Sequence, residues 1–206
     1  MKHKKSFLNF GFLAAVCMYF AVPADATLII SVEPVTAAPG TTGGTFDVLL
    51  TDSGSAGVSV AGFSFEIQSS NPAIIFTGAF TSTATATYIF NGNSLFGPEI
   101  DTQTSPSLIA QDLAASGSTI LNSGDVVGLG QVFFNVSPTA TPGPVTVSFT
   151  GGLAGNDLSD PAGANIPINT FTSGTINITS TPEPSSLLML LAGTAALAAW
   201  NRWRRA

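Results

Sequence analysis

The stretch "GVSVAGFSFEIQ" (residues 57–68) alternates apolar and polar residues in two runs that differ in phase. An extended chain points successive side chains to opposite faces, so each run predicts a strand with one buried face. The positions expected to point inward are Val58, Val60, Phe63, Phe65 and Ile67. The change of phase at Ala61–Gly62 predicts a β-bulge, because one extra residue reverses the alternation.

Similar runs, separated by residues typical of turns, recur along the middle of the chain. They are "TLIISV" (27–32), "TFDVLLT" (45–51), "AIIFTGAF" (73–80), "ATATYIFN" (84–91), "SLIAQDLA" (107–114), "DVVGLGQVFFNVS" (125–137), "GPVTVSFT" (143–150) and "SGTINIT" (173–179). Helical periodicity is lacking over any useful length. The pattern predicts an all-β fold of about nine strands, arranged as a sandwich of two antiparallel sheets.

Charged residues are distributed very unevenly. The six Lys and Arg residues, the single His and the single Cys all lie in the two terminal segments. Of the twelve carboxylates, all but Asp25 and Glu183 lie between residues 27 and 181, which leaves ten acids and no cation there. This excludes a nucleic-acid interface, a disulfide, a zinc site and a nucleophile activated by His or Cys.

The N-terminus predicts a secretory signal peptide over residues 1–26. Three lysines at positions 2, 4 and 5 precede the apolar stretch "FLNFGFLAAVCMYFAV" (7–22). Ala24 and Ala26 supply the small residues that signal peptidase requires, so cleavage is expected after Ala26. An uncleaved membrane anchor is the alternative, and Pro23 with the small residues that follow argues against it.

The C-terminus combines a polar motif, an apolar segment and a cluster of arginines. "PEP" at Pro182, Glu183 and Pro184 precedes an uncharged segment, and residues 185–201 have the minimum length of a transmembrane helix. The tail 202–206 carries Arg202, Arg204 and Arg205, which favour the cytoplasmic side. The order resembles the bacterial PEP-CTERM sorting signal over residues 181–206. That resemblance implies processing by an exosortase, transient residence in the inner membrane, and export from a bacterium that makes exopolysaccharide.

The sandwich domain, residues 27–180, resembles cohesin domains in the order of its segments. The matching stretches are "VEPVTAAPGTTGGTFDVLLTDS" (32–53), "VAGFSFEIQSSNPAIIFTGA" (60–79), "GDVVGLGQVFFNVSPTATPGPVTVSFT" (124–150) and "GTINI" (174–178). The resemblance implies a cohesin-like jelly roll. Cohesins bind dockerin modules, but no partner-binding motif of the family is visible in this sequence.

Two groups of acidic residues are candidates for chemistry. Asn156, Asp157 and Asp160 offer oxygen ligands for Ca²⁺ on a loop, although an Asx-rich turn explains them better. A glycosidase needs two carboxylates at a defined separation, for which the candidate pairs are Glu66 with Glu99 and Asp47 with Asp112. The strand pattern places Glu66 on a solvated face. We therefore expect no catalytic residue and no cofactor, with Ca²⁺ as the one metal that has a candidate site.

The sequence supports three functional hypotheses. The first is a non-enzymatic protein of the cell surface or extracellular matrix with a structural or adhesive role, whose precursor is anchored in the membrane. The second is a protein- or carbohydrate-binding module of the cohesin type, with a surface protein or exopolysaccharide as partner. The third and least favoured is a carboxylate-dependent glycoside hydrolase.

Overall fold

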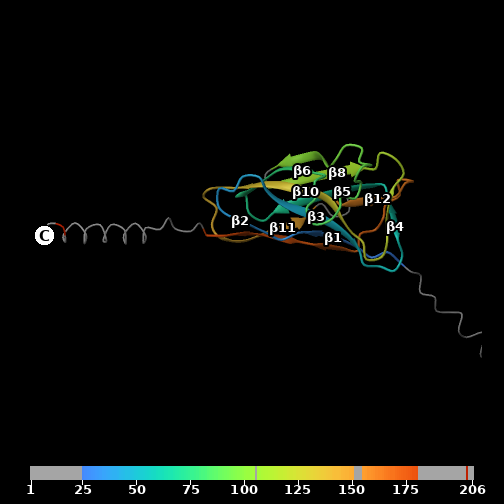
Figure 1. The fold of residues 1–206 in the computed structure, drawn as a ribbon, viewed down its shortest axis with the longest axis horizontal. Helices are drawn as coiled ribbons and strands as arrows, with labels where there is room; N and C mark the ends of the chain where they lie inside the picture. The colour runs from blue at the N-terminus through green and yellow to red at the C-terminus, as the bar shows by residue number, and fades with distance from the viewer. Residues whose placement is uncertain (1–24, 105, 151–154, 181–202, 204–206) are drawn as a thin grey trace, which may run out of the picture.

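A computed structural model describes residues 25–104, 106–150 and 155–180, together with Trp203. The described residues fold into a β-sandwich (Figure 1). The signal peptide up to residue 24, the sorting motif, the expected transmembrane segment 185–201 and the three arginines of the tail lie outside the described residues. Within the described part, no helix is long and apolar enough to cross a membrane.

One sheet has five strands in the order β13-β1-β3-β10-β6. Their bounds are β13 (Thr170–Thr172), β1 (Leu28–Val32), β3 (Gly44–Asp52), β10 (Val126–Val136) and β6 (Ile74–Phe80). All neighbours in this sheet are antiparallel except β1 and β13, which run parallel.

The facing sheet has seven strands, six of them in the order β2-β14-β11-β5-β8-β7, with β12 also paired to β5. Their bounds are β2 (Val35–Ala37), β14 (Gly174–Ile178), β11 (Gly143–Phe149), β5 (Gly62–Ser69), β8 (Ser107–Leu113), β7 (Glu99–Thr104) and β12 (Asp157–Ser159). A small third sheet pairs β4 (Val58–Val60) with β9 (Thr119–Leu121). Fourteen strands are described, against about nine predicted, and five of the fourteen are only three residues long. The all-β sandwich predicted from the alternation is confirmed.

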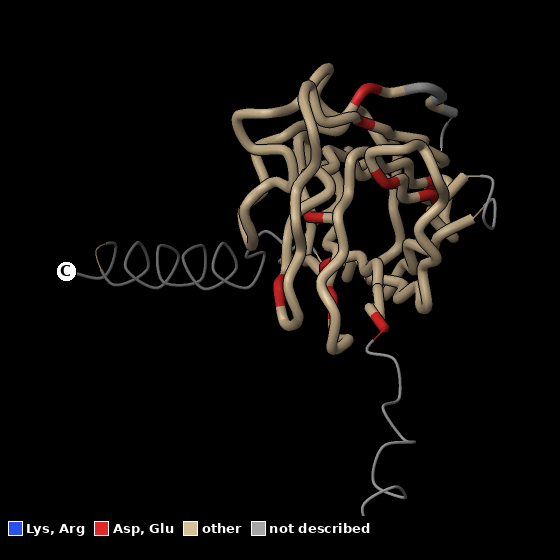
Figure 2. Tube along the Cα trace, turned by 90° about the vertical axis from the view of Figure 1, so that its right-hand side faces the viewer, with Lys and Arg blue, Asp and Glu red and all other residues tan. Residues whose placement is uncertain are grey.

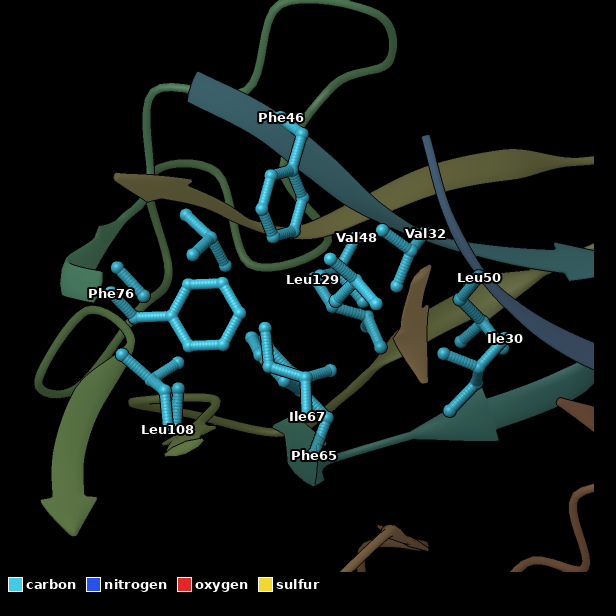
Figure 3. Close-up of a cluster of buried hydrophobic side chains, with 14 of the residues drawn as sticks. Ile30, Val32, Phe46, Val48, Leu50, Phe65, Ile67, Phe76, Leu108 and Leu129 are labelled. Atoms are coloured by element: carbon cyan, nitrogen blue, oxygen red, sulfur yellow. The ribbon is translucent and has the colours of Figure 1, made fainter. Parts of the chain in front are cut away.

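The core fills the space between the two large sheets (Figure 3). Phe46 from β3 packs against Phe76 and Phe134, with ring centroids 6.1 and 5.8 Å apart. On the facing sheet Phe65 and Ile67 of β5 are fully buried, as their alternation predicts. Burial of such side chains contributes about 1.5–3 kcal/mol each, which explains how the domain folds without a disulfide.

The change of phase in residues 57–68 has a different cause from the predicted bulge. Strand β4 ends at Val60 and pairs with β9, whereas β5 begins at Gly62 and joins the seven-stranded sheet. Ala61 is the junction, and its N–H donates to the carbonyl of Ser159 at 2.7 Å. The two runs are therefore separate strands of different sheets, and each keeps its own alternation.

The prediction of a strand over residues 84–91 is wrong. This segment belongs to the connection between β6 and β7, residues 81–98, which we call the cover loop. Tyr88, Ile89 and Phe90 are all buried, although adjacent residues of a strand point to opposite faces. Apolar residues in an irregular segment that folds over the sandwich produced the misleading pattern.

Candidate binding groove

Two buried carboxylates fix the cover loop to the sandwich. Asp47 of β3 accepts hydrogen bonds from the backbone N–H groups of Ala84 and Thr85 at 2.6 and 2.7 Å. Its other oxygen accepts from the Gln131 side chain at 3.2 Å. Asp47 alternates with the inward-pointing Phe46 and Val48, so it points away from the core, but the loop covers it so that it is only 1% exposed.

Asp112, near the end of β8, holds the second half of the loop. Its carboxylate accepts from the hydroxyls of Tyr88 and Ser94, both at 2.6 Å, and from the N–H groups of Phe96 and Leu113 at 3.2 and 2.8 Å. Burial, followed by the hydrogen bond and charge of Asp112, raises the pKa of the Tyr88 phenol. Three of these four donors belong to the loop, so one carboxylate fixes its conformation at three points.

Three hollows lie along β5, β8 and the end of β6, the second and third of them bordered by the cover loop, and we call them together the side groove. The first, about 150 Å³, includes Ser64 and Asp157 in its lining. The second, about 120 Å³, shares Phe63, Gln111 and Leu113 with the first. The third, about 280 Å³, shares Phe96 with the second. Each hollow therefore shares at least one lining residue with the next.

Large apolar side chains stand exposed along this groove. Phe96 is 63% exposed and Phe80 is 55% exposed, and both line the third hollow. Phe80 packs edge-on against Phe133 of β10, with centroids 5.0 Å apart. Leu113 is 47% exposed and lines the other two hollows. Exposed apolar residues that gather around a concave surface are typical of interaction sites.

The sequence analysis missed this site, because alternation identifies only side chains that point into the core. The buried phenylalanines are Phe46, Phe63, Phe65, Phe76, Phe90 and Phe134. Phe96 stands in "NSLFGPE" (93–99), among residues that favour turns. Phe96 belongs to no alternating run, and this is the only sequence signal that distinguishes it from the phenylalanines of the strands.

The polar lining of the groove is acidic or neutral. Glu99 and Asp157 contribute carboxylates, and Ser64 and Gln111 contribute neutral donors and acceptors. Figure 2 shows acidic residues and no cation in the described sandwich. The groove therefore favours an uncharged or cationic ligand over an anionic one.

The structure does not bring either candidate carboxylate pair into a shared site. Asp47 lies in the five-stranded sheet and Asp112 in the seven-stranded sheet, each held by the hydrogen bonds described above. Glu66 on β5 and Glu99 on β7 share a face, but β8 lies between their strands. Strand spacing and register place their Cα atoms about 12 Å apart, and Glu99 lines the second hollow whereas Glu66 lines none of the three.

The calcium candidates have separate hydrogen-bonding roles. Asn156 is buried, accepts from the N–H of Glu66 at 2.9 Å and donates to the carbonyl of Thr150 at 2.5 Å. Asp160 accepts from the N–H groups of Ala162 and Ala164 in its own turn, both at 2.8 Å. Asp157 accepts from the side chain of Asn165. No cluster of three or more His, Cys, Asp or Glu residues that could hold a metal occurs among the described residues.

Residues 180–205 match the family model of the PEP-CTERM protein-sorting motif. This confirms the resemblance seen in the sequence and identifies an exported protein that is processed at its C-terminus for the cell surface. No curated protein sequence matches the chain.

The sandwich has the fold of cohesins. It superposes on the CaCohA2 cohesin, solved as a dockerin complex, with a TM-score of 0.55 at 17% identity, covering 74% of this chain and 100% of that one. The sixth cohesin of scaffoldin B from Acetivibrio cellulolyticus, bound to a Cel5 dockerin, also gives a TM-score of 0.55. The identity is 15%, and the match covers 74% of this chain and 99% of that one. A non-cellulosomal cohesin from the archaeon Archaeoglobus fulgidus gives a TM-score of 0.53 at 15% identity, and the match covers 80% of this chain and 98% of that one.

Together these findings define a cohesin-like β-sandwich protein that carries a PEP-CTERM sorting motif. At such low identity the likeness establishes the fold and transfers no binding residue.

Proposed function

We propose that this chain is a non-enzymatic adhesion protein of the cell surface or extracellular matrix, which binds a protein partner in the side groove. The exposed rings of Phe80 and Phe96, which both line the third hollow, are the observation that carries this proposal. The cohesin-like fold supports it, because two of the similar structures were solved with a dockerin bound.

The chemistry of the groove indicates the kind of partner. Its apolar rim provides area for burial, and aromatic side chains commonly dominate the energy of protein interfaces. Glu99 and Asp157 add negative charge at the same place. The partner we expect presents apolar side chains flanked by Lys or Arg.

The termini deliver this module to its place. Signal peptidase removes residues 1–26, residues 185–201 hold the precursor in the inner membrane, and an exosortase cleaves near Pro182–Pro184. The sorting-motif match supports this sequence of events. The intact mass of the protein recovered outside the cells tests both cleavages, and a full-length chain in the cytosol would contradict them.

The test of binding uses matched phenylalanine variants. The purified sandwich is immobilised and exposed to extracellular protein from the parent organism, in parallel with Phe80→Ser, Phe96→Ser and Phe171→Ser. Phe171 is also exposed, at 36%, but it lies on β13 at the opposite edge of the five-stranded sheet from β6. We expect one stoichiometric protein on the wild type and on Phe171→Ser, with about tenfold or greater loss of affinity for the other two. Equal retention by all four proteins would exclude the groove.

A further inference from the structure

The carboxylate of Asp52 lies beside the nitrogen that begins the mature chain. Asp52 is the last residue of β3 and is fully buried. Its Oδ1 accepts from the N–H of Thr27 at 3.2 Å and from the N–H of Gly54 at 2.9 Å. Its Oδ2 is also buried, and no described residue donates a hydrogen bond to it. A buried carboxylate oxygen without a donor is costly, so this site is incomplete in the uncleaved chain.

Signal-peptide cleavage supplies the missing donor. Hydrolysis of the Ala26–Thr27 bond adds the hydroxyl of water to the carbonyl carbon of Ala26 and a proton to the nitrogen of Thr27. At neutral pH the products are a carboxylate on the leaving peptide and an ammonium on Thr27. The single N–H of the amide thereby becomes a positively charged group with three donors.

We propose that the Thr27 ammonium binds the buried carboxylate of Asp52 and that cleavage thereby completes the fold. One N–H continues to bind Oδ1, and another reaches Oδ2. This inference rests on the proposed export, and it adds a specific role for the new terminus. The ammonium is the only cationic group in residues 27–180, so Asp52 has no competing partner within the sandwich.

The surrounding backbone fixes the position of the new terminus. The carbonyl of Thr27 accepts from the N–H of Ser53 at 2.9 Å, and Leu28 begins β1 opposite Asp52 in the register with β3. Two other carboxylates belong to this region. Asp25 leaves with the signal peptide, and Asp125 accepts hydrogen bonds from the backbone and side chain of Asn122. Neither provides an alternative to the pair between Thr27 and Asp52.

The test compares two N-termini on one sequence. Residues 27–180 contain every described strand and the whole buried core, so this protein is prepared with a free amine and with an Nα-acetyl group. The free amine is expected to raise the folding equilibrium constant about tenfold to a hundredfold, as for a hydrogen bond to a charged group. Urea unfolding at pH 7 measures the difference, which should disappear at alkaline pH as the amine loses its proton.

Asp52→Asn is the control, because it removes the charge and keeps the shape. The amine and acetyl forms of this variant are expected to be equally stable. Equal stability of the two wild-type forms would overturn the pairing, as would an advantage of the amine that persists in Asp52→Asn. The amine–acetyl comparison needs no substitution, so it remains decisive if the variant fails to fold. A secreted protein that begins elsewhere than Thr27 would overturn the cleavage itself.

Discussion

Tyr88 is the only tyrosine between residues 27 and 180, in a stretch that also lacks Lys, Arg, His and Cys. Burial and Asp112 raise its pKa above the usual value for a phenol. The folded state therefore holds the proton more tightly than the unfolded state. This contribution to stability is complete below the unfolded pKa of about 10 and is lost as the pH rises above it.

Alkaline unfolding of the Nα-acetylated 27–180 protein, in which the terminal amine cannot titrate, should therefore report on one side chain. Above pH ~10 we expect the free energy of unfolding to fall by about 1.4 kcal/mol per pH unit. Urea unfolding at stepped pH measures the slope, and tyrosinate absorbance shows whether the phenol ionises as the fold is lost. Tyr88→Phe should be less stable at pH 7 by about 1.5–3 kcal/mol and should lose this slope. A slope unchanged in Tyr88→Phe would contradict the assignment.

Asp47 and Asp160 provide a matched pair of substitutions for the cover loop. Each carboxylate accepts two backbone N–H groups, but Asp47 is buried beneath the loop whereas Asp160 serves an exposed turn. Asp47→Ala should destabilise the domain by about 2–4 kcal/mol, because it removes a buried carboxylate that accepts three hydrogen bonds beneath the loop. Asp160→Ala should cost about 0.5–1 kcal/mol. Hydrogen exchange at Ala84 and Thr85 measures the local effect, and similar costs for both variants would argue against the anchoring role of Asp47.

At the scale of elements, β14 is held closely on both sides. It pairs with β11 and β2, and its first residue, Gly174, has no room for a side chain. An added Cβ would lie 2.5 Å from Cγ1 of Val32 and 2.7 Å from the carbonyl oxygen of that residue. The backbone atom cannot move aside easily, so a glycine is required for close approach rather than for an unusual dihedral angle.

Gly174→Ala is therefore expected to destabilise the sandwich by about 1–3 kcal/mol through overpacking. The neighbouring Ser173 is exposed, and Ser173→Ala should change the free energy of unfolding by less than about 0.5 kcal/mol. Urea denaturation of both variants provides the comparison. A Gly174→Ala protein as stable as the wild type would show that β1 and β14 can separate without cost.

An element could be predicted from the sequence where its own residues determine its conformation, and not where residues distant in sequence determine it. Strands β3, β5 and β10 alternate because one face meets the core, so their positions follow from the residues alone. The cover loop could not be predicted, because its conformation depends on Asp47 and Asp112, which are distant in sequence. The side groove depends on that loop and was missed with it. The parallel pairings of β1 with β13 and β2 with β14 join the two ends of the domain and leave no local signal.

At the scale of the whole molecule, the sandwich carries one sign of charge. Ten carboxylates and no cationic side chain lie between residues 27 and 181, so mutual repulsion opposes the compact state. Raising NaCl from about 10 to 150 mM shortens the Debye length from about 30 to 8 Å and should raise the melting temperature. Differential scanning calorimetry at pH 7 measures the shift. A melting temperature independent of salt over this range would mean that the carboxylates are too far apart to repel one another.

The hydrogen bond from the N–H of Thr179 to the carbonyl of Ala37, at 2.9 Å, fastens the chain just after β14. Pro182 follows three residues later, and an extended chain covers about 10 Å in that interval. This distance is less than the radius of gyration of a folded domain of about 100 residues, which is about 13 Å. An enzyme that holds the sorting motif must therefore rest against the end of the sandwich, where the turns 38–43 and 137–142 carry no charge. C-terminal processing therefore requires the enzyme to contact the folded sandwich, and the shape of the sandwich restricts which enzymes can carry it out.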